Sequence, residues 1–349
     1  MRQILFAGAG HASLIALDIL SRRGLPASFT LVSSGTTTHY SGMVPGHIEG
    51  IYGADAMTIA LPPFCARAGV RFISADLLGL GGGIAHTTAG ALPYDDLVLN
   101  LGAIAHRPGP LAHPRAIPAK PFPALMAGLS EAAGAKTFAV VGGGAAGVEV
   151  ALALAASGRT VRLIERGNQI LPTFPNRFRR LVARHLARRG VTVETGAAVE
   201  DVGATDLLLR GARVPADAVL AFTGAAPPPL VADLPLLRAD DGFLAIDAGF
   251  QTSNPSVLAV GDVATNIPDP RPKAGVFAVR QGPLLAQTIE ARVKGAPPPH
   301  HRIQRRGLVL LSTGARSAVG TRNGLTLEGR ALWRLKDRLD RAFVTRFLP

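Results

Sequence analysis

The chain has 349 residues, of which 48% are hydrophobic and 17% charged, and a formal net charge of +13. This composition excludes a disordered chain and indicates a folded protein with room for two or three domains. Cys65 is the single cysteine, which excludes an internal disulfide, a Cys-x-x-Cys redox pair and a cysteine metal cluster, so we expect a cytoplasmic setting and no metal site.

The chain opens on a predicted strand at residues 4–7, followed by a glycine turn and a helix that ends near residue 22. The turn has the spacing G-x-G-x-x-G of a dinucleotide-binding loop, with serine at its last position: Gly8, Gly10 and Ser13. These small residues permit a tight turn, approach of the backbone to a pyrophosphate, and close packing of helix on strand. The next predicted strand, residues 29–32, ends at Ser33, where a ribose-binding carboxylate is usual, and a serine hydroxyl bonds ribose more weakly.

The loop at residues 36–47 is polar and rich in turn-forming residues. His39 and His47 are candidate acid–base groups within it, although a hydrogen-bonded structural role is favoured for both. Short apolar runs alternate with turns from residue 70 to residue 100, which predicts an inserted β-meander and a final buried strand that runs into Gly102. The proline-rich residues 107–123, which include Lys120 and Pro121, are predicted to form a linker.

A second strand–glycine–helix unit follows the linker. A β-branched strand at residues 137–141 leads to a complete G-x-G-x-x-G at Gly142, Gly144 and Gly147, and then to an alanine-rich helix at residues 145–157. The following strand ends at Glu165, 18 positions after the last glycine, where a carboxylate would bind a ribose 2′-hydroxyl. Because Glu165 would repel a 2′-phosphate, we expect NADH to be preferred over NADPH, while the neighbouring Arg166 leaves the other outcome open.

The remaining elements repeat or close these units. The run at residues 216–224, which ends at Gly224, repeats the strand-to-glycine form of residues 95–102. A late buried strand at residues 257–260 ends in Gly261 and Asp262, and a helix then extends to about residue 293. A carboxylate at this end of a strand lies on the ligand side of an open α/β sheet. Strands are expected at residues 308–311 and 317–321, before a helix at residues 330–347.

The positive charge is concentrated in two segments. Residues 176–190 hold six arginines and no acid, and residues 300–349 hold eleven Lys or Arg against three Asp or Glu. No motif for nucleic-acid binding is present, so solvated helix faces, an acidic partner or an anionic membrane surface remain as explanations. The last helix has a predicted apolar stripe: Leu332, Leu335, Leu339, Phe343 and Phe347. We favour packing of this stripe on the same chain or on a second subunit over membrane binding; the oligomeric state stays open.

Together, these motifs resemble the two-dinucleotide-binding flavoproteins of the pyridine nucleotide–disulfide oxidoreductase fold. Residues 10–12, 40–46, 273–282 and 333–337 make the chain similar to type II NADH dehydrogenases, and most similar to the flavoprotein fused to or encoded beside selenophosphate synthetase. The resemblance implies an α/β fold with two Rossmann-like domains that bind FAD and NAD(P), inserted β-meanders and a small C-terminal α+β segment. The implied segments are an FAD-binding domain at 1–106 and 226–299, an NAD(P)H-binding domain at 107–225, and a basic C-terminal segment at 300–349.

The implied activity is an FAD-dependent NAD(P)H oxidoreductase that passes hydride from nicotinamide to flavin and then to a quinone or small acceptor without redox cysteines. The alternative is a flavin-binding partner or sensor module for an enzyme of selenium metabolism. We expect a cytoplasmic protein. The alternative location is peripheral, in contact with the inner face of the membrane.

The implied cofactor contacts fall into two groups. For FAD they are Gly8, Gly10, His11, Ser13, Ser33, Gly102, Gly261 and Asp262, and for the nicotinamide nucleotide Gly142, Gly144, Gly147, Glu165 and Gly224. No catalytic residue is assigned, because the flavin carries the chemistry. Lys273 and Gln281 are candidates, and Lys273 could stabilise anionic reduced flavin.

Overall fold

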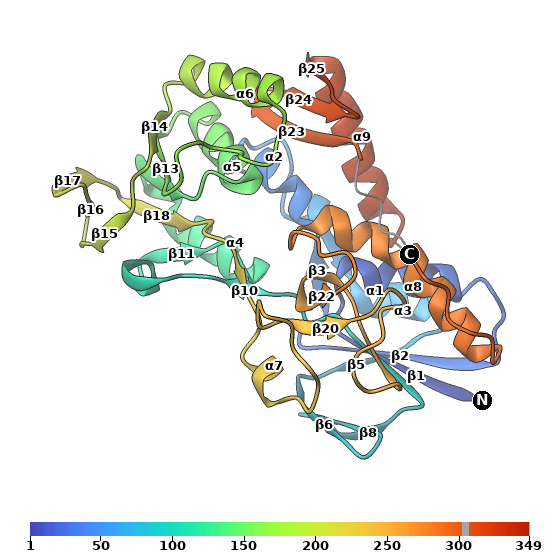
Figure 1. The fold of residues 1–349 in the computed structure, drawn as a ribbon. Coiled ribbons are helices and arrows are strands. Elements are labelled where there is room, and N and C mark those ends of the chain that lie inside the picture. Colours follow the sequence, from blue (N-terminus) through green and yellow to red (C-terminus); the bar gives the residue numbers. More distant parts are fainter. Residues whose placement is uncertain (302–306, 349) are drawn as a thin grey trace.

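Two five-stranded parallel sheets form the cores of two units in the computed structural model, which describes residues 1–301 and 307–348 (Figure 1). The first sheet has the strand order β21-β9-β1-β2-β5. Its strands are β1 (Arg2–Ala7), β2 (Ala27–Ser33), β5 (Arg71–Ser74), β9 (Asp96–Leu99) and β21 (Val257–Ala259). The late strand β21 pairs with β9, so two stretches of the chain that are far apart in the sequence form the first unit. The predicted α/β fold class is confirmed.

The second sheet has the order β11-β18-β12-β13-β14. Its strands are β11 (Ala116–Pro118), β12 (Thr137–Val141), β13 (Thr160–Glu165), β14 (Thr192–Thr195) and β18 (Ala218–Ala221). The prediction of a linker at residues 107–123 is wrong, because β11 pairs in parallel with β18 and Ala116 is fully buried. Pro118 is tolerated there because an edge strand leaves one side unpaired.

The helices cover these sheets in the way that their sequences predict. In the first unit, α1 (His11–Leu20) packs along α8 (Gly275–Val293), and their apolar faces join the core of the first sheet. In the second unit, α5 (Ala145–Ala156) packs on β12 and β13. The arginine-rich segment forms α6 (Asn176–Arg188), which buries Phe178, Val182 and Leu186 and exposes most of its arginines.

Two antiparallel meanders project from the molecule, one at the bottom and one at the left of Figure 1. The first comprises β6 (Leu77–Gly81), β7 (Ile84–Thr87) and β8 (Gly90–Pro93), and the second β15 (Val199–Val202), β16 (Asp206–Leu209) and β17 (Ala212–Pro215). The smaller elements are β3 (Thr37–His39), α2 (Val44–Ile48), β4 (Thr58–Ala60), α3 (Leu61–Ala68), β10 (Ile104–Ala105), α4 (Phe122–Glu131), β19 (Ala225–Ala226), α7 (Leu230–Asp233), β20 (Leu244–Ile246) and β22 (Ala264–Asn266).

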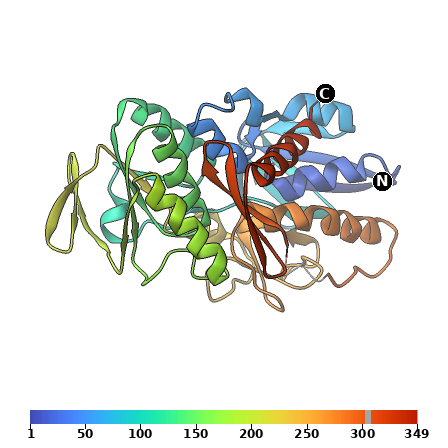
Figure 2. The same cartoon turned by 90° about the horizontal axis from the view of Figure 1, so that it is seen from above.

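The C-terminal segment lies against both units. Its antiparallel sheet consists of β23 (Val309–Gly314), β24 (Ser317–Arg322) and β25 (Leu325–Gly329), and α9 (Arg330–Thr345) follows. Seen from above in Figure 2, this segment lies between α6 of the second unit and the helices of the first. Residues 302–306 and residue 349 of the predicted segment lie outside the described residues.

The apolar stripe predicted for the last helix is only partly buried. Phe347 is 1% exposed and packs on Phe64, and Phe343 stacks on Tyr40, as the favoured intramolecular packing requires. Leu335 and Leu339, however, are 39% and 50% exposed. The covered face of the helix instead carries charged side chains, which are described below. Among the described residues, no helix is both long and apolar enough to cross a membrane.

Candidate functional site

The first glycine loop is closed around the side chain of a buried asparagine. Gly8 has a φ of +104°, and a side chain there would overlap the carbonyl oxygen of Asn100. A Cβ atom at Gly10 would lie 2.6 Å from the Asn100 amide nitrogen, and that nitrogen donates to the hydroxyl of Ser13 at 3.0 Å. The small residues at these three positions therefore make room for Asn100, a site residue that lies outside the glycine motifs.

Asn100 also joins the late Gly-Asp turn to the first loop. A Cβ atom at Gly261, whose φ is +72°, would lie 2.5 Å from the Asn100 amide oxygen. The Gly261 N–H donates to the side-chain oxygen of Gln281 at 2.6 Å, so Gln281, 6% exposed, holds this turn from α8. A signal for Asn100 was present in the sequence, because it is a polar residue directly after a fully apolar buried run, residues 97–99.

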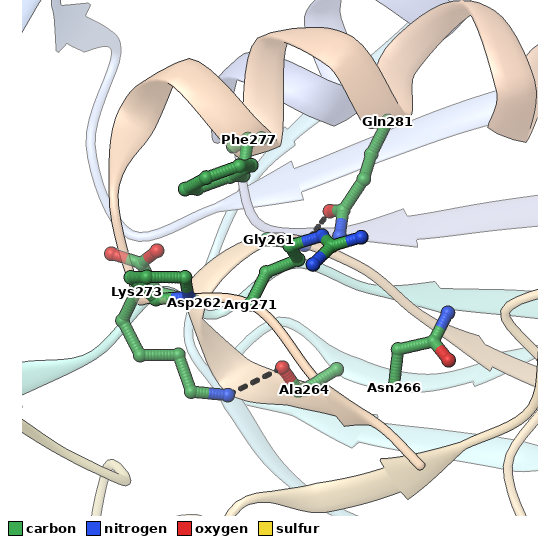
Figure 3. A pocket seen from close by; sticks show the side chains of 10 residues that line it. Gly261, Asp262, Ala264, Asn266, Arg271, Lys273, Phe277 and Gln281 are labelled. Carbon is green, nitrogen blue, oxygen red and sulfur yellow. Dashed lines mark hydrogen bonds between the residues drawn. The ribbon is translucent and has the colours of Figure 1, made fainter. Parts of the chain in front are cut away.

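Asp262 follows and lines a pocket together with Lys273, Phe277 and Gln281 (Figure 3). The carboxylate of Asp262 forms an ion pair with the ammonium of Lys120, which comes from the second unit. No sequence pattern pointed to Lys120, because it reaches the pocket only through the pairing of β11 with the second sheet.

Lys273 is held away from solvent at the same pocket. Its ammonium donates to the carbonyl oxygen of Ala264 at 2.5 Å and to the hydroxyl of Thr265 at 2.6 Å, and it lies 4.0 Å from the centre of the Phe243 ring. Burial lowers the pKa of Lys273 to about 8, an effect that the carboxylates of Asp241 and Asp262 oppose. Lys273 is thus not an ordinary surface lysine, because its side chain is only 13% exposed.

His11 is the first residue of α1 and packs against two aromatic rings that stack on each other, those of Tyr40 and Phe343. Its ring centre is 5.4 Å from that of Tyr40 and 5.2 Å from that of Phe343. Burial lowers the pKa of His11, so its imidazole is neutral at pH 7. His39 stacks on Phe122 at 4.9 Å, and Nδ1 of His47 lies 2.9 Å from the Tyr52 carbonyl oxygen. Ser33 ends β2, and Gly102, with a φ of +71°, follows β9.

The second glycine loop repeats this construction. Gly142 has a φ of +118°, and side chains at Gly142 and Gly147 would overlap carbonyl oxygens of Phe222 and Gly142, respectively. Glu165 lies at the end of β13, where one carboxylate oxygen accepts the Gly143 N–H and the other the Gly167 N–H, both at 2.6 Å. A Cβ at Gly144 would have open space around it. Gly224, with a φ of +110°, accepts the His106 N–H at 3.1 Å.

The helix that follows each glycine loop also offers free backbone N–H groups to a dinucleotide. The helices α1 and α5 begin after Gly10 and Gly144, and neither of these residues provides a side-chain cap. The first-turn N–H groups are therefore open to an anion, which the helix dipole also favours. The pyrophosphate groups of two dinucleotides match these two helix ends in charge and in hydrogen-bonding capacity.

A buried ionic cluster joins the C-terminal helix to both units. The ammonium of Lys336 donates to the Asp340 carboxylate and to the Gly42 carbonyl oxygen, each at 2.7 Å, and lies 3.9 Å from the Glu149 carboxylate. Glu149 belongs to α5 and also accepts the Ser312 N–H at 2.7 Å. The three charged side chains are 7–17% exposed. Burial raises the pKa of Glu149 and of Asp340, and the two carboxylates outweigh burial and raise the pKa of Lys336.

Comparison with known proteins agrees with this geometry. Residues 2–282 match the model of the family described as pyridine nucleotide-disulphide oxidoreductase. The demethylphylloquinone reductase NdbB of Synechocystis sp. is 33% identical over 205 residues, which cover 55% of this chain and half of that protein. The NAD-dependent persulfide reductase of A. fulgidus superposes with a TM-score of 0.79 at 21% identity, covering 92% of this chain and 64% of that one. NDH2 of Plasmodium falciparum, solved in complex with NADH, superposes with a TM-score of 0.82 at 14% identity, covering 99% and 97%.

Proposed function

The chain belongs to the pyridine nucleotide-disulphide oxidoreductase family, and on this premise we propose that it is an FAD-dependent NADH oxidoreductase that delivers electrons to a quinone. FAD, when bound, accepts hydride from nicotinamide and carries the redox chemistry. The observation that carries the proposal is the pair of glycine loops on uncapped helices, one in each unit, with the Asp262 pocket of the first unit contacted by a residue of the second.

Each of the two glycine loops would bind one of the two cofactors. Gly8, Gly10 and Ser13 would admit the FAD pyrophosphate, and Asp262 would accept a hydrogen bond from a hydroxyl of the sugar-like chain that carries the flavin ring. Gly142, Gly144 and Gly147 would do the same for NADH. Hydride transfer needs the reacting atoms at about 3–3.5 Å, so it must occur where the two units meet.

NADH is proposed as the preferred nucleotide because of Glu165. Its carboxylate is fixed by the N–H groups of Gly143 and Gly167, and it thus stands beside the phosphate-binding loop. An ionised carboxylate accepts hydrogen bonds from a ribose diol and repels a 2′-phosphate.

A quinone is proposed as the acceptor because the name of NdbB describes a reductase of demethylphylloquinone. Cys65 is the single cysteine, so a reaction through a pair of redox cysteines within this chain is excluded. The test is NADH oxidation by the FAD-loaded protein with a water-soluble naphthoquinone, compared with oxygen alone and with ferricyanide. Quinone-dependent turnover well above the rate with oxygen supports the proposal, and turnover with ferricyanide but not with any quinone contradicts the choice of acceptor.

A peripheral membrane location is part of the same proposal, since many quinones dissolve in lipid. The exposed side chains Leu335 and Leu339 lie on α9 beside exposed Arg334 and Arg338, which is the composition of an interfacial helix. The test is cosedimentation with liposomes that contain anionic lipid, using the full chain and Leu335→Asp/Leu339→Asp. Binding that the double substitution abolishes supports contact with lipid; no binding by the unaltered chain supports a location in the cytoplasm.

The finer resemblance, to a flavoprotein that accompanies selenophosphate synthetase, gives a separate proposal of a partner from selenium metabolism. Its test is binding of the purified protein to that synthetase in gel filtration. Co-elution with little NADH turnover would favour the partner module over the oxidoreductase.

A further inference from the structure

Two lysines converge on the Asp262 pocket, and the structure separates their roles. The ammonium of Lys273 is occupied by the carbonyl oxygen of Ala264, the hydroxyl of Thr265 and the face of the Phe243 ring. In Figure 3 its side chain extends toward Ala264, along the wall of the pocket. Lys273 therefore holds the segment after the Gly-Asp turn in place.

Lys120 reaches the same pocket from the second unit. It lies between β11 and α4 of the second unit, yet its ammonium forms an ion pair with Asp262 and donates to the Lys273 carbonyl oxygen at 3.3 Å. The side chains of Lys120 and Asp262 are 30% and 18% exposed. A cation of the nucleotide-binding unit thus contacts two residues that line the pocket of the other unit.

The contact between Lys120 and Asp262 places a cation of the second unit beside the pocket of the first unit. Asp262 has more acceptor positions than Lys120 uses, so its carboxylate can bind a cofactor hydroxyl and keep the ammonium beside it. The N-terminus of α8 at Gly275 adds partial positive charge on the same side. Negative charge that develops in this pocket would therefore meet a cation in a partly buried setting, where charge interactions are stronger than in water.

We propose that the ammonium of Lys120, held in place by Asp262, stabilises the anionic two-electron-reduced form of the bound flavin. This inference rests on the proposed function, because it requires flavin to bind at this pocket. It assigns the stabilising cation to Lys120 of the second unit, whereas the sequence pointed to Lys273.

The test is the midpoint potential of the bound flavin, measured by chemical reduction against a reference dye after unbound FAD has been removed. Lys120→Met should shift the equilibrium toward oxidised flavin at least tenfold, which for two electrons is about 30 mV. It should also weaken the adduct that sulfite forms with oxidised flavin, because that adduct is anionic too. Lys120→Arg should keep the native values, and Lys136→Met, an exposed lysine of the same unit, serves as the matched control.

An unchanged potential and sulfite affinity in Lys120→Met would overturn the proposal and leave Lys120 as a tether between the units. If the variant releases its flavin, the ratio of its dissociation constants for reduced and oxidised FAD gives the same quantity. Neither measurement uses NADH or a quinone. Failure of the proposed NADH oxidation is therefore distinguishable from failure of this inference.

Discussion

Lys336→Met should destabilise the protein strongly, because it removes the cation from a buried cluster that contains two carboxylates. Methionine keeps the length and apolar stem of the side chain but leaves Asp340 and Glu149 facing each other without a counter-charge. Loss of one partner from a buried ion pair destabilises by about 3–5 kcal/mol. Unfolding entropy of about 2.1 cal/mol/K per residue gives roughly 0.73 kcal/mol/K for 349 residues, so the melting temperature should fall by about 4–7 °C.

The assay is thermal unfolding of FAD-loaded protein at one fixed FAD concentration. Arg338→Met, an exposed position on the same helix, is the matched control and should change the melting temperature by less than about 1 °C. Lys336→Met combined with Asp340→Asn should be less destabilised than Lys336→Met alone, because one of the two unpaired charges is gone. A fall below about 1 °C for Lys336→Met, or a double variant no milder than the single, would refute this reasoning.

Three further predictions concern the two sites. Asp262→Ala should weaken FAD retention by about 10- to 150-fold, the effect of losing a hydrogen bond to a charged group, as measured by the ratio of flavin to protein absorbance after gel filtration; full retention would count against the assignment. Glu165→Ala should lower kcat/KM for NADH by a similar factor without lowering it for NADPH, whereas a native protein that prefers NADPH would show the specificity argument to be wrong. Because the pKa of Lys273 is about 8 in the folded protein and 10.5 ordinarily, the unfolded chain binds the extra proton between these values, and the contribution of Lys273 to stability should rise with pH across that window. The melting temperature of Lys273→Met should therefore fall further behind that of the native protein between pH 8 and pH 10, and parallel curves would exclude this titration.

The local architecture of both glycine loops could be predicted from the sequence. The strand predicted at residues 137–141 has the same bounds as β12, because a β-branched run that stops at glycines leaves little freedom of assignment. Two C-terminal strands, β23 and β24, and the helix α9 were located for the same reason, since their patterns are local, whereas the third strand of that sheet, β25, was not predicted. The proline-rich segment at residues 107–123 was misassigned, because the pairing of β11 depends on β18, about a hundred residues later.

The charged contacts could not be predicted for a related physical reason. The spacing of leucines in α9 identifies an apolar stripe, but Leu335 and Leu339 are exposed while Lys336 and Asp340 are covered. The covered face depends on Glu149, which lies on α5 in another unit. The ion pair of Lys120 with Asp262 could not be predicted for the same reason, since the two residues are 142 positions apart in the sequence.

Anaerobic titration of the FAD-loaded protein with NADH shows directly whether nicotinamide reduces the bound flavin. We expect one equivalent of NADH per bound FAD to bleach the flavin absorbance, since hydride passes between the cofactors of the two units. Dithionite, which reduces flavin without a nucleotide site, provides the end point. A flavin that stays tightly bound and is bleached by dithionite, but by neither NADH nor NADPH, would show that the protein is not an NAD(P)H oxidoreductase.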